Sequence, residues 1–132
     1  MNTVKYAVTK QYEGKFSDAV LDIIDSLNRE GFGILTQIDV QETLKRKLNT
    51  HYSKYMILGA CNPPNAYKAL QAEREIGLLL PCNVIVYEED TRVFISVMKP
   101  SVALTLSSNP DVAVIAEDVE SKLISALNTA TK

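Results

Sequence analysis

Five short stretches of the chain have the apolar pattern of β-strands. In the first, Val4, Tyr6 and Val8 alternate with polar or small residues, so a half-buried strand is expected there. Four further strands are predicted at about residues 32–38, 53–60, 82–88 and 92–99. The last two flank Glu89-Asp90-Thr91, and they are expected to form a hairpin that turns at these residues.

Apolar residues spaced three and four apart predict two long helices. The first covers about residues 16–27, with Ser17 expected as its N-cap and Gly31 as its left-handed exit. The second begins at Asn109-Pro110, where asparagine is the expected cap and proline the first helical residue, and it reaches Leu127.

Two shorter helices are predicted between the strands. One covers about residues 40–48 and follows a capping box that begins at Asp39. The other follows Pro63-Pro64 and runs from about Ala66 to Arg74. Residues 76–81 are then expected to be extended and to return the chain to the sheet.

The order of these elements predicts the fold class. The length of 132 residues suits one domain, residues 1–132, with a single hydrophobic core. We expect an α+β fold, with a mostly antiparallel sheet of about five strands and the two long helices on one face. A doubly wound parallel sheet is the alternative. The hairpin at 82–99 and the short helix at 40–48 argue against it.

Both faces of the predicted sheet are largely apolar in its last two strands. One face holds Val84, Val86, Val93, Ile95 and Val97, and the other holds Asn83, Ile85, Tyr87, Phe94, Ser96 and Met98. An antiparallel sheet with one face in water should be polar on that face. The second face is therefore expected to be covered by a partner subunit, by a ligand or by the loop Ser101–Ser108.

Composition and charge narrow the class of protein. The net charge is −2, so no general attraction to nucleic acid or to an anionic membrane is expected. Apolar runs such as Ile76–Leu80 are far shorter than a membrane span, and no secretory signal is recognised at the N-terminus. We therefore expect a soluble cytoplasmic protein with free cysteine thiols and no membrane partner.

Each of the two cysteines precedes an asparagine and lies near a proline. Cys61-Asn62 closes the third strand, and Cys82-Asn83 opens the fourth. If these strands run antiparallel, both thiols lie at the same end of the sheet, with Cα atoms within about 10 Å. These four residues are the candidate ligand-binding or thiol site.

Three interpretations of the cysteines remain open. Both can be buried small apolar residues, one can be a reactive or carrier thiol, or they can belong to a metal or cofactor site. A metal site normally needs three or four ligands, His51 is the only histidine and no C-x-x-C is present, so no metal site is predicted and no cofactor is identified. The helix start after Cys61 favours a thiolate, but Pro63 and Pro64 offer no N–H there.

No catalytic constellation is recognised in the rest of the chain. Lys45-Arg46-Lys47 is the one basic cluster, and it suits the C-terminal end of the helix predicted at 40–48. Nucleic acid is not an expected partner, because binding it would require more basic residues on the same surface. Enzymatic activity is therefore not predicted, although the sequence leaves the question open.

The cysteine motifs resemble a known family. Leu58-Gly59-Ala60-Cys61-Asn62-Pro63, followed by Leu79-Leu80-Pro81-Cys82, is similar to the domain-of-unknown-function family numbered 302. The resemblance implies a TATA-box-binding-protein-like α+β topology and a homodimer. It implies no activity, and the fold comparison does not bring DNA binding with it.

Two functional hypotheses follow from these observations. The first is a homodimeric module that binds a ligand or a partner at a site around the CN motifs. The alternative is a thiol-based redox or sulfur-transfer protein that uses Cys61 or Cys82.

Overall fold

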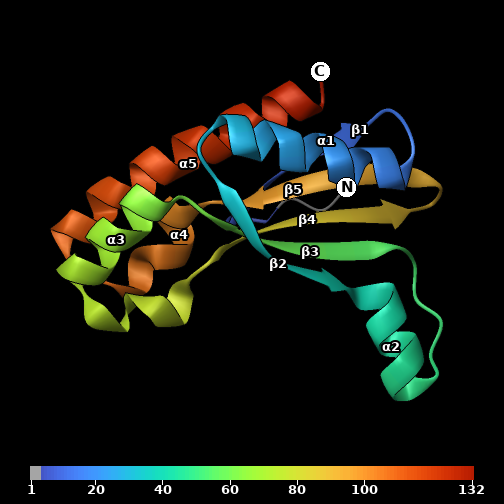
Figure 1. The fold of residues 1–132 in the computed structure, drawn as a ribbon, viewed down its shortest axis with the longest axis horizontal. Coiled ribbons are helices and arrows are strands. Elements are labelled where there is room, and N and C mark those ends of the chain that lie inside the picture. Colours follow the sequence, from blue (N-terminus) through green and yellow to red (C-terminus); the bar gives the residue numbers. More distant parts are fainter. Residues whose placement is uncertain (1–3) are drawn as a thin grey trace.

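A five-stranded antiparallel sheet carries the two long helices on one face (Figure 1). The computed structural model describes residues 4–132. The strands are β1 (Ala7–Tyr12), β2 (Gly33–Asp39), β3 (Tyr55–Cys61), β4 (Cys82–Glu89) and β5 (Arg92–Met98). The helices are α1 (Phe16–Arg29), α2 (Val40–Leu48), α3 (Pro63–Ala72), α4 (Pro100–Ala103) and α5 (Pro110–Ala130), with 3₁₀ turns η1 (Arg74–Leu79) and η2 (Leu104–Leu106).

The strand order is β1-β5-β4-β3-β2, and every neighbouring pair is antiparallel. The predicted α+β class is therefore confirmed, and the parallel alternative is excluded. β1 and β2 form the two edges, and β4 lies at the centre. Of the described residues, no helix is long and apolar enough to cross a membrane.

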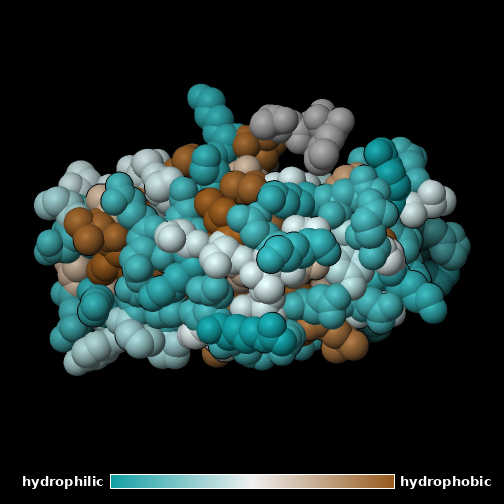
Figure 2. Space-filling view, turned by 90° about the horizontal axis from the view of Figure 1, so that it is seen from above, coloured by the Kyte–Doolittle hydropathy of each residue, from teal (hydrophilic) through white to brown (hydrophobic). Residues whose placement is uncertain are grey.

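The main core lies between the sheet and the pair α1 and α5. Ile23 and Leu27 from α1 meet Leu123 from α5 and the inward-facing strand residue Val84, and all four are fully buried. Each such side chain contributes about 1.5–3 kcal/mol by leaving water. The Ser26 hydroxyl donates to the carbonyl of Ala126 at 2.6 Å and ties the two helices together. Their outward surface is mostly hydrophilic, as Figure 2 shows.

A second, smaller core lies beyond the end of the sheet. The N-terminal half of α5 overhangs the strands, and α3, η1 and α4 pack beneath it (Figure 1). Its buried residues are Ala69, Ile76, Leu104, Val112 and Ala116. The loop expected to cover the second face of the sheet, Ser101–Ser108, is instead largely helical and packs against α5.

The second face of the sheet is covered in part by its own side chains. Phe94 is 2% exposed and Ser96 is 6% exposed, while Ile85 and Tyr87 are half-buried. Much of the apolar surface predicted on this face is therefore already shielded within the chain.

Three local structures differ from those predicted. The first strand begins at Ala7, because the chain turns at Lys5-Tyr6, where the carbonyl of Tyr6 accepts the Lys99 amide at 2.7 Å. Ser17 is not the cap of α1: the helix begins one residue earlier, and its N-cap Lys15 makes no side-chain bond. The return segment expected to be extended is mostly the 3₁₀ turn η1.

The caps of α2 and α5 follow the predicted chemistry, and α3 is capped in the same way. Asp39 accepts the Glu42 amide at 3.0 Å, Asn62 accepts the Asn65 amide at 3.3 Å, and Asn109 accepts the Asp111 amide at 2.9 Å. Because Asn62 caps it, α3 begins at Pro63, ahead of the predicted start at Ala66.

Gly59 is a position where the sheet has no room for a side chain. A Cβ atom there would lie 2.3 Å from Oγ1 of Thr36 on β2 and 3.0 Å from Cγ of Pro81. Gly33, on β2, has no atom within 4 Å of the corresponding point. Gly33 is therefore a suitable control for a substitution at Gly59, since both glycines lie in strands and only Gly59 is crowded.

We expect Gly59→Ala to lower the free energy of unfolding by about 1–3 kcal/mol, because the new methyl group would be too close to Thr36 and Pro81. Gly33→Ala should change it by less than about 0.5 kcal/mol. Urea unfolding measures both. Combining Gly59→Ala with Thr36→Ala should recover part of the lost free energy of unfolding. Equal losses in Gly59→Ala and Gly33→Ala would show that Gly59 is not in a crowded position.

Candidate functional site

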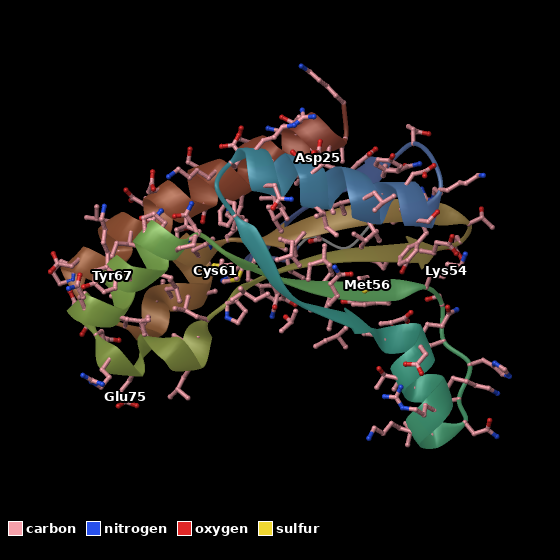
Figure 3. The ribbon with its side chains drawn as sticks, viewed as in Figure 1. Asp25, Lys54, Met56, Cys61, Tyr67 and Glu75 are labelled. Atoms are coloured by element: carbon pink, nitrogen blue, oxygen red, sulfur yellow. The ribbon has the colours of Figure 1, made fainter. Side chains whose placement is uncertain are left out.

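The two cysteines meet where the chain leaves the sheet and re-enters it. Ala60 lies directly opposite Cys82 in the β3–β4 register, so Cys61 is one residue beyond that pair. The predicted placement of both cysteines at one end of the sheet is confirmed by this register. Figure 3 shows Cys61 at the end of β3, beside the start of α3. No disulfide joins the two residues.

A pocket of about 280 Å³ opens at this point, and we call it the corner pocket. It lies where the end of the sheet meets α3, η1 and α5. Its walls are mainly apolar, and they are formed by Phe32, Leu35, Ala60, Ala66, Ala69, Leu70, Gly77, Leu80, Pro81, Leu104, Ile115 and Val119. The polar lining residues are Cys61, Asn62, Asn65 and Cys82.

A β-bulge shapes one wall of the corner pocket. Ile34 pairs with Ala60 and Thr36 pairs with Gly59, so Leu35 is an extra residue in β2. Bulges turn a side chain out of the regular alternation and are frequent beside functional sites. Leu35 is 65% exposed and lines the pocket, so the bulge places an apolar side chain at its wall.

The two thiols have different surroundings. Cys82 is 5% exposed, and burial together with the neighbouring Cys61 raises its pKa to about 11. Its thiol is therefore protonated at neutral pH, and it is a poor nucleophile. Cys61 is only half-buried. Of the two residues, Cys61 is the more exposed.

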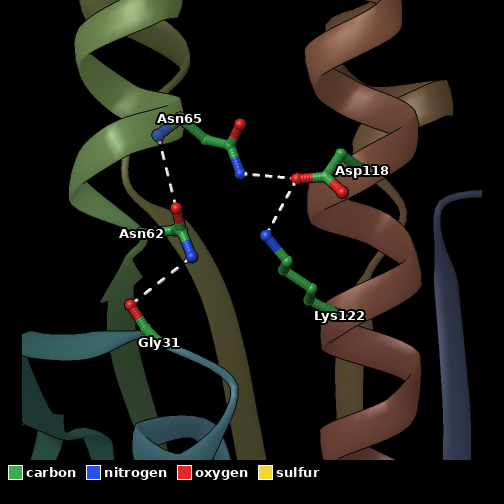
Figure 4. A network of polar contacts seen from close by, with 5 residues as sticks. All are labelled: Gly31, Asn62, Asn65, Asp118 and Lys122. Carbon is green, nitrogen blue, oxygen red and sulfur yellow. Dashed lines mark hydrogen bonds and ion pairs between the residues drawn. The ribbon is translucent and has the colours of Figure 1, made fainter.

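A chain of amide contacts holds the corner in place (Figure 4). The Asn62 side chain caps α3, and its Nδ2 donates to the carbonyl of Gly31 at 3.4 Å. Gly31 has φ of +90°, a conformation that glycine adopts readily, and a Cβ there would lie 3.2 Å from that nitrogen. Asn62 therefore joins the exit of α1 to the entry of α3.

Asn65 continues the same network to α5. Its Nδ2 donates to Oδ2 of Asp118 at 2.8 Å, and Nζ of Lys122 donates to the same oxygen at 3.0 Å. The Asn65 hydrogen bond, and then Lys122, lower the pKa of Asp118. The side chains of Asn62 and Asn65 are thus engaged in holding helices.

Asn83 lies apart from the other three predicted site residues. It is exposed and pairs with Gly59, and it does not line the corner pocket. Cys82 and Val84 face the helices, so the strand alternation turns Asn83 to the opposite face. The structure therefore brings together Cys61, Asn62 and Cys82, and it adds Asn65 and Asp118, which the sequence analysis missed.

The other candidate groups have local structural roles. Arg46 pairs with Glu42 at 2.6 Å, and Nζ of Lys45 donates to Oδ1 of Asn49 at the end of α2. In residues 4–132, no three side chains of histidine, cysteine, aspartate or glutamate are grouped so as to hold a metal ion.

Comparison with known proteins identifies the family. Residues 6–130 match the family described as "Domain of unknown function DUF302". The fold is similar to the crystal structure of an uncharacterized conserved DUF302 protein from Bacillus stearothermophilus, with a TM-score of 0.90 and 29% identity, covering 96% of this chain and 99% of that one. No curated protein matches. The chain belongs to the DUF302 family, as the motifs around Cys61 and Cys82 predicted.

Proposed function

We propose that this protein binds a small apolar molecule in the corner pocket. The observation that carries the proposal is a mainly apolar pocket of about 280 Å³ beside the two cysteine motifs. Its volume is close to the lower limit of about 300 Å³ typical of ligand sites, so the expected ligand is small. Because the two asparagine side chains are already bonded, apolar contact supplies most of the affinity.

Xenon is a suitable probe, since apolar cavities of this kind bind it without specific chemistry. We expect saturable binding in the corner pocket, measured by xenon NMR and located from shifted methyl signals of lining residues. Ala66→Phe should abolish this binding because the ring fills the pocket beside α3.

Ala113→Phe is the matched control. Ala113 is exposed on α5 and does not line the corner pocket, so this variant should bind xenon as the parent does. If xenon shifts no lining signal in the parent protein, or if Ala66→Phe binds it unchanged, the proposal is wrong. Circular dichroism melting verifies that both variants are folded.

A thiol function is the second candidate, and it rests on the exposure of Cys61. A redox or sulfur-transfer role requires an accessible sulfur, and Cys61 supports that requirement better than Cys82 does. We therefore assign any thiol chemistry to Cys61. Such chemistry suits a reducing compartment, and the cytoplasm is the location that we propose.

Alkylation with iodoacetamide at pH 8, followed by intact mass, separates the two thiols. We expect a single adduct on Cys61 and none on Cys82, because the pKa of the buried thiol is about 11. Cys61→Ser should remain unmodified under the same conditions. The proposed thiol function is wrong if both residues form adducts at similar rates, or if Cys61 forms none over several hours.

We also propose that the protein forms a homodimer through β2 and α2. This edge of the molecule exposes three large apolar side chains: Leu35 is 65% exposed, Ile38 is 45% exposed and Leu48 is 66% exposed. β2 is an edge strand with neither lysine nor proline, the residues that usually protect such an edge. No residue of α2 is fully buried, and the helix stands away from the sheet (Figure 1). Because Leu35 also lines the corner pocket, this dimer would place the partner beside the pocket.

Light scattering at micromolar concentration tests the dimer. The double variant Ile38→Glu/Leu48→Glu should be monomeric, because charges at both positions oppose burial of the surface. Val114→Glu is the control, since Val114 is 69% exposed on α5, away from this edge. A monomeric parent protein, or a dimer that survives the double substitution, would exclude this interface.

A further inference from the structure

A groove of about 620 Å³ lies on the face of the sheet opposite α1 and α5. We call it the tyrosine groove, because four of the six tyrosines of the chain line it: Tyr6, Tyr52, Tyr55 and Tyr87. None of these residues lines the corner pocket. The groove is therefore a separate site, and neither proposed function makes use of it.

The strand register creates the aromatic row along this groove. Tyr55 pairs with Tyr87, and Tyr87 pairs with Phe94, so the three rings share one face of the sheet. Ring centroids are 5.7 Å and 5.4 Å apart, with interplanar angles of 22° and 25°. Because these rings face one another, their edges and the tyrosine hydroxyls point away from the sheet, toward the groove.

At one end of the aromatic row, the side chain of Arg92 lies over the last ring, that of Phe94. The guanidinium carbon of Arg92 lies 5.4 Å from the centroid of Phe94, over the ring. Tyr52 ends the row at the other side, 6.3 Å from Tyr55 and inclined at 55°. The ring faces are thus largely occupied, and a ligand in the groove would meet hydroxyl groups and ring edges.

The other three tyrosines of the groove lie close enough to Tyr55 to affect its hydroxyl. Burial raises the pKa of Tyr55, and the nearby Tyr52, Tyr87 and Tyr6 raise it further. In residues 4–132, the hydrogen bonds that we find involve none of these four hydroxyls. They are therefore available to accept hydrogen bonds from a ligand.

Carboxylates give the groove its charge. Glu88, Glu89 and Asp90 line it at the β4–β5 hairpin, and its lining within residues 4–132 includes no lysine, arginine or histidine. Glu88 pairs with the buried Val93, so its side chain points to the helix face, and Glu89 and Asp90 supply the charge on the groove side. No ion pair within residues 4–132 involves these three carboxylates. Burial and then the charge of Glu89 raise the pKa of Tyr87, so this carboxylate acts on the aromatic row. The groove therefore favours a positively charged ligand.

A pair of hydroxyls lies on the floor of the groove. Oγ1 of Thr9 and Oγ of Ser96 are 2.8 Å apart, so one donates to the other. Ser96 is 6% exposed, and the ring edges and the side chain of Ile85 add apolar surface nearby. The floor thus offers hydrocarbon contact beside hydrogen-bonding groups, a combination that suits an aliphatic chain ending in an amine.

We propose that the tyrosine groove binds an aliphatic amine as its ammonium cation. The ammonium N–H groups would donate to tyrosine hydroxyls and to the carboxylates of the hairpin, while the alkyl chain would lie along the ring edges. An anion is disfavoured by the carboxylates of Glu89 and Asp90. A quaternary ammonium ion has no N–H to donate, so it would lose the hydrogen bonds on which recognition depends.

Calorimetric titration with three probes tests the ligand class. Putrescine supplies ammonium groups on an aliphatic chain, butanediol is its neutral counterpart, and tetramethylammonium is a cation without N–H donors. We expect saturable binding of putrescine that weakens with added salt, and binding of the other two that is weaker by about ten-fold or more. The proposal is wrong if putrescine shows no saturable binding, or if either comparison probe binds as tightly as putrescine. It is also wrong if a single-stranded oligonucleotide binds saturably in place of putrescine.

Paired variants locate the site. Tyr52→Phe removes one hydroxyl, and Glu89→Gln removes one charge, and each should weaken putrescine binding by about three-fold or more. Glu88→Gln/Glu89→Gln/Asp90→Asn should abolish it. Asn tolerates the left-handed conformation of Asp90, whose φ is 52°, so the hairpin should keep its shape.

Two further variants are controls with the same chemistry outside the groove. Tyr67 is 65% exposed on α3, and Glu117 is exposed on α5. Tyr67→Phe and Glu117→Gln should leave putrescine binding unchanged. If they weaken it as much as Tyr52→Phe and Glu89→Gln do, binding is non-specific and the assignment to the groove is wrong. Amide chemical shifts show whether each variant keeps the native fold.

Discussion

The antiparallel pairing of β3 with β4 is the constraint on which the rest of the architecture depends. It sets Ala60 opposite Cys82, so the chain must return to the place where it left the sheet. The twenty residues between the cysteines therefore form a β3–β4 connection, α3 and η1, which extends beyond the end of the sheet and does not cross over its face. The N-terminal half of α5 packs on this connection, and the corner pocket lies where the connection meets the sheet.

Polar contacts fix this corner in addition to its apolar packing. Asn62 and Asn65 bond to three different elements, and each buried amide has its partners. Loss of one partner would leave a buried polar group unpaired, which costs about 1–3 kcal/mol. The same bonds make these amides unavailable to a ligand. Within the two CN motifs, Asn62 therefore has a structural role, because it holds two helices at the end of the sheet.

Much of the fold could be predicted from the sequence, because its signals are local. Capping by Asp39 and Asn109, and the hairpin after Glu89, depend on a few adjacent residues. The position of the corner site could also be predicted, since the prolines beside the cysteines end one strand and begin the next. Local signals were misleading at Ser17, which lies inside α1 although serine is a frequent cap.

The remaining features depend on contacts between distant segments, and no short pattern encodes them. The orientation of Asn83 depends on the register between β3 and β4, where a shift of one residue would reverse it. The Asn65–Asp118 bond joins residues 53 apart in the chain. The tyrosine groove requires the register of three strands together with Tyr6 and Tyr52, which lie outside them.

α5 belongs to two cores at once, and this has a consequence for how occupancy of the corner pocket would be detected. Its 21 residues span about 30 Å, with one half on the sheet and the other on the smaller core. Small clusters of this kind open locally more often than a whole domain unfolds. A molecule held between the two cores adds its binding free energy to the cost of that opening. Its presence would thus appear as slower amide hydrogen exchange in α3 and η1, with little change in the shape of the protein.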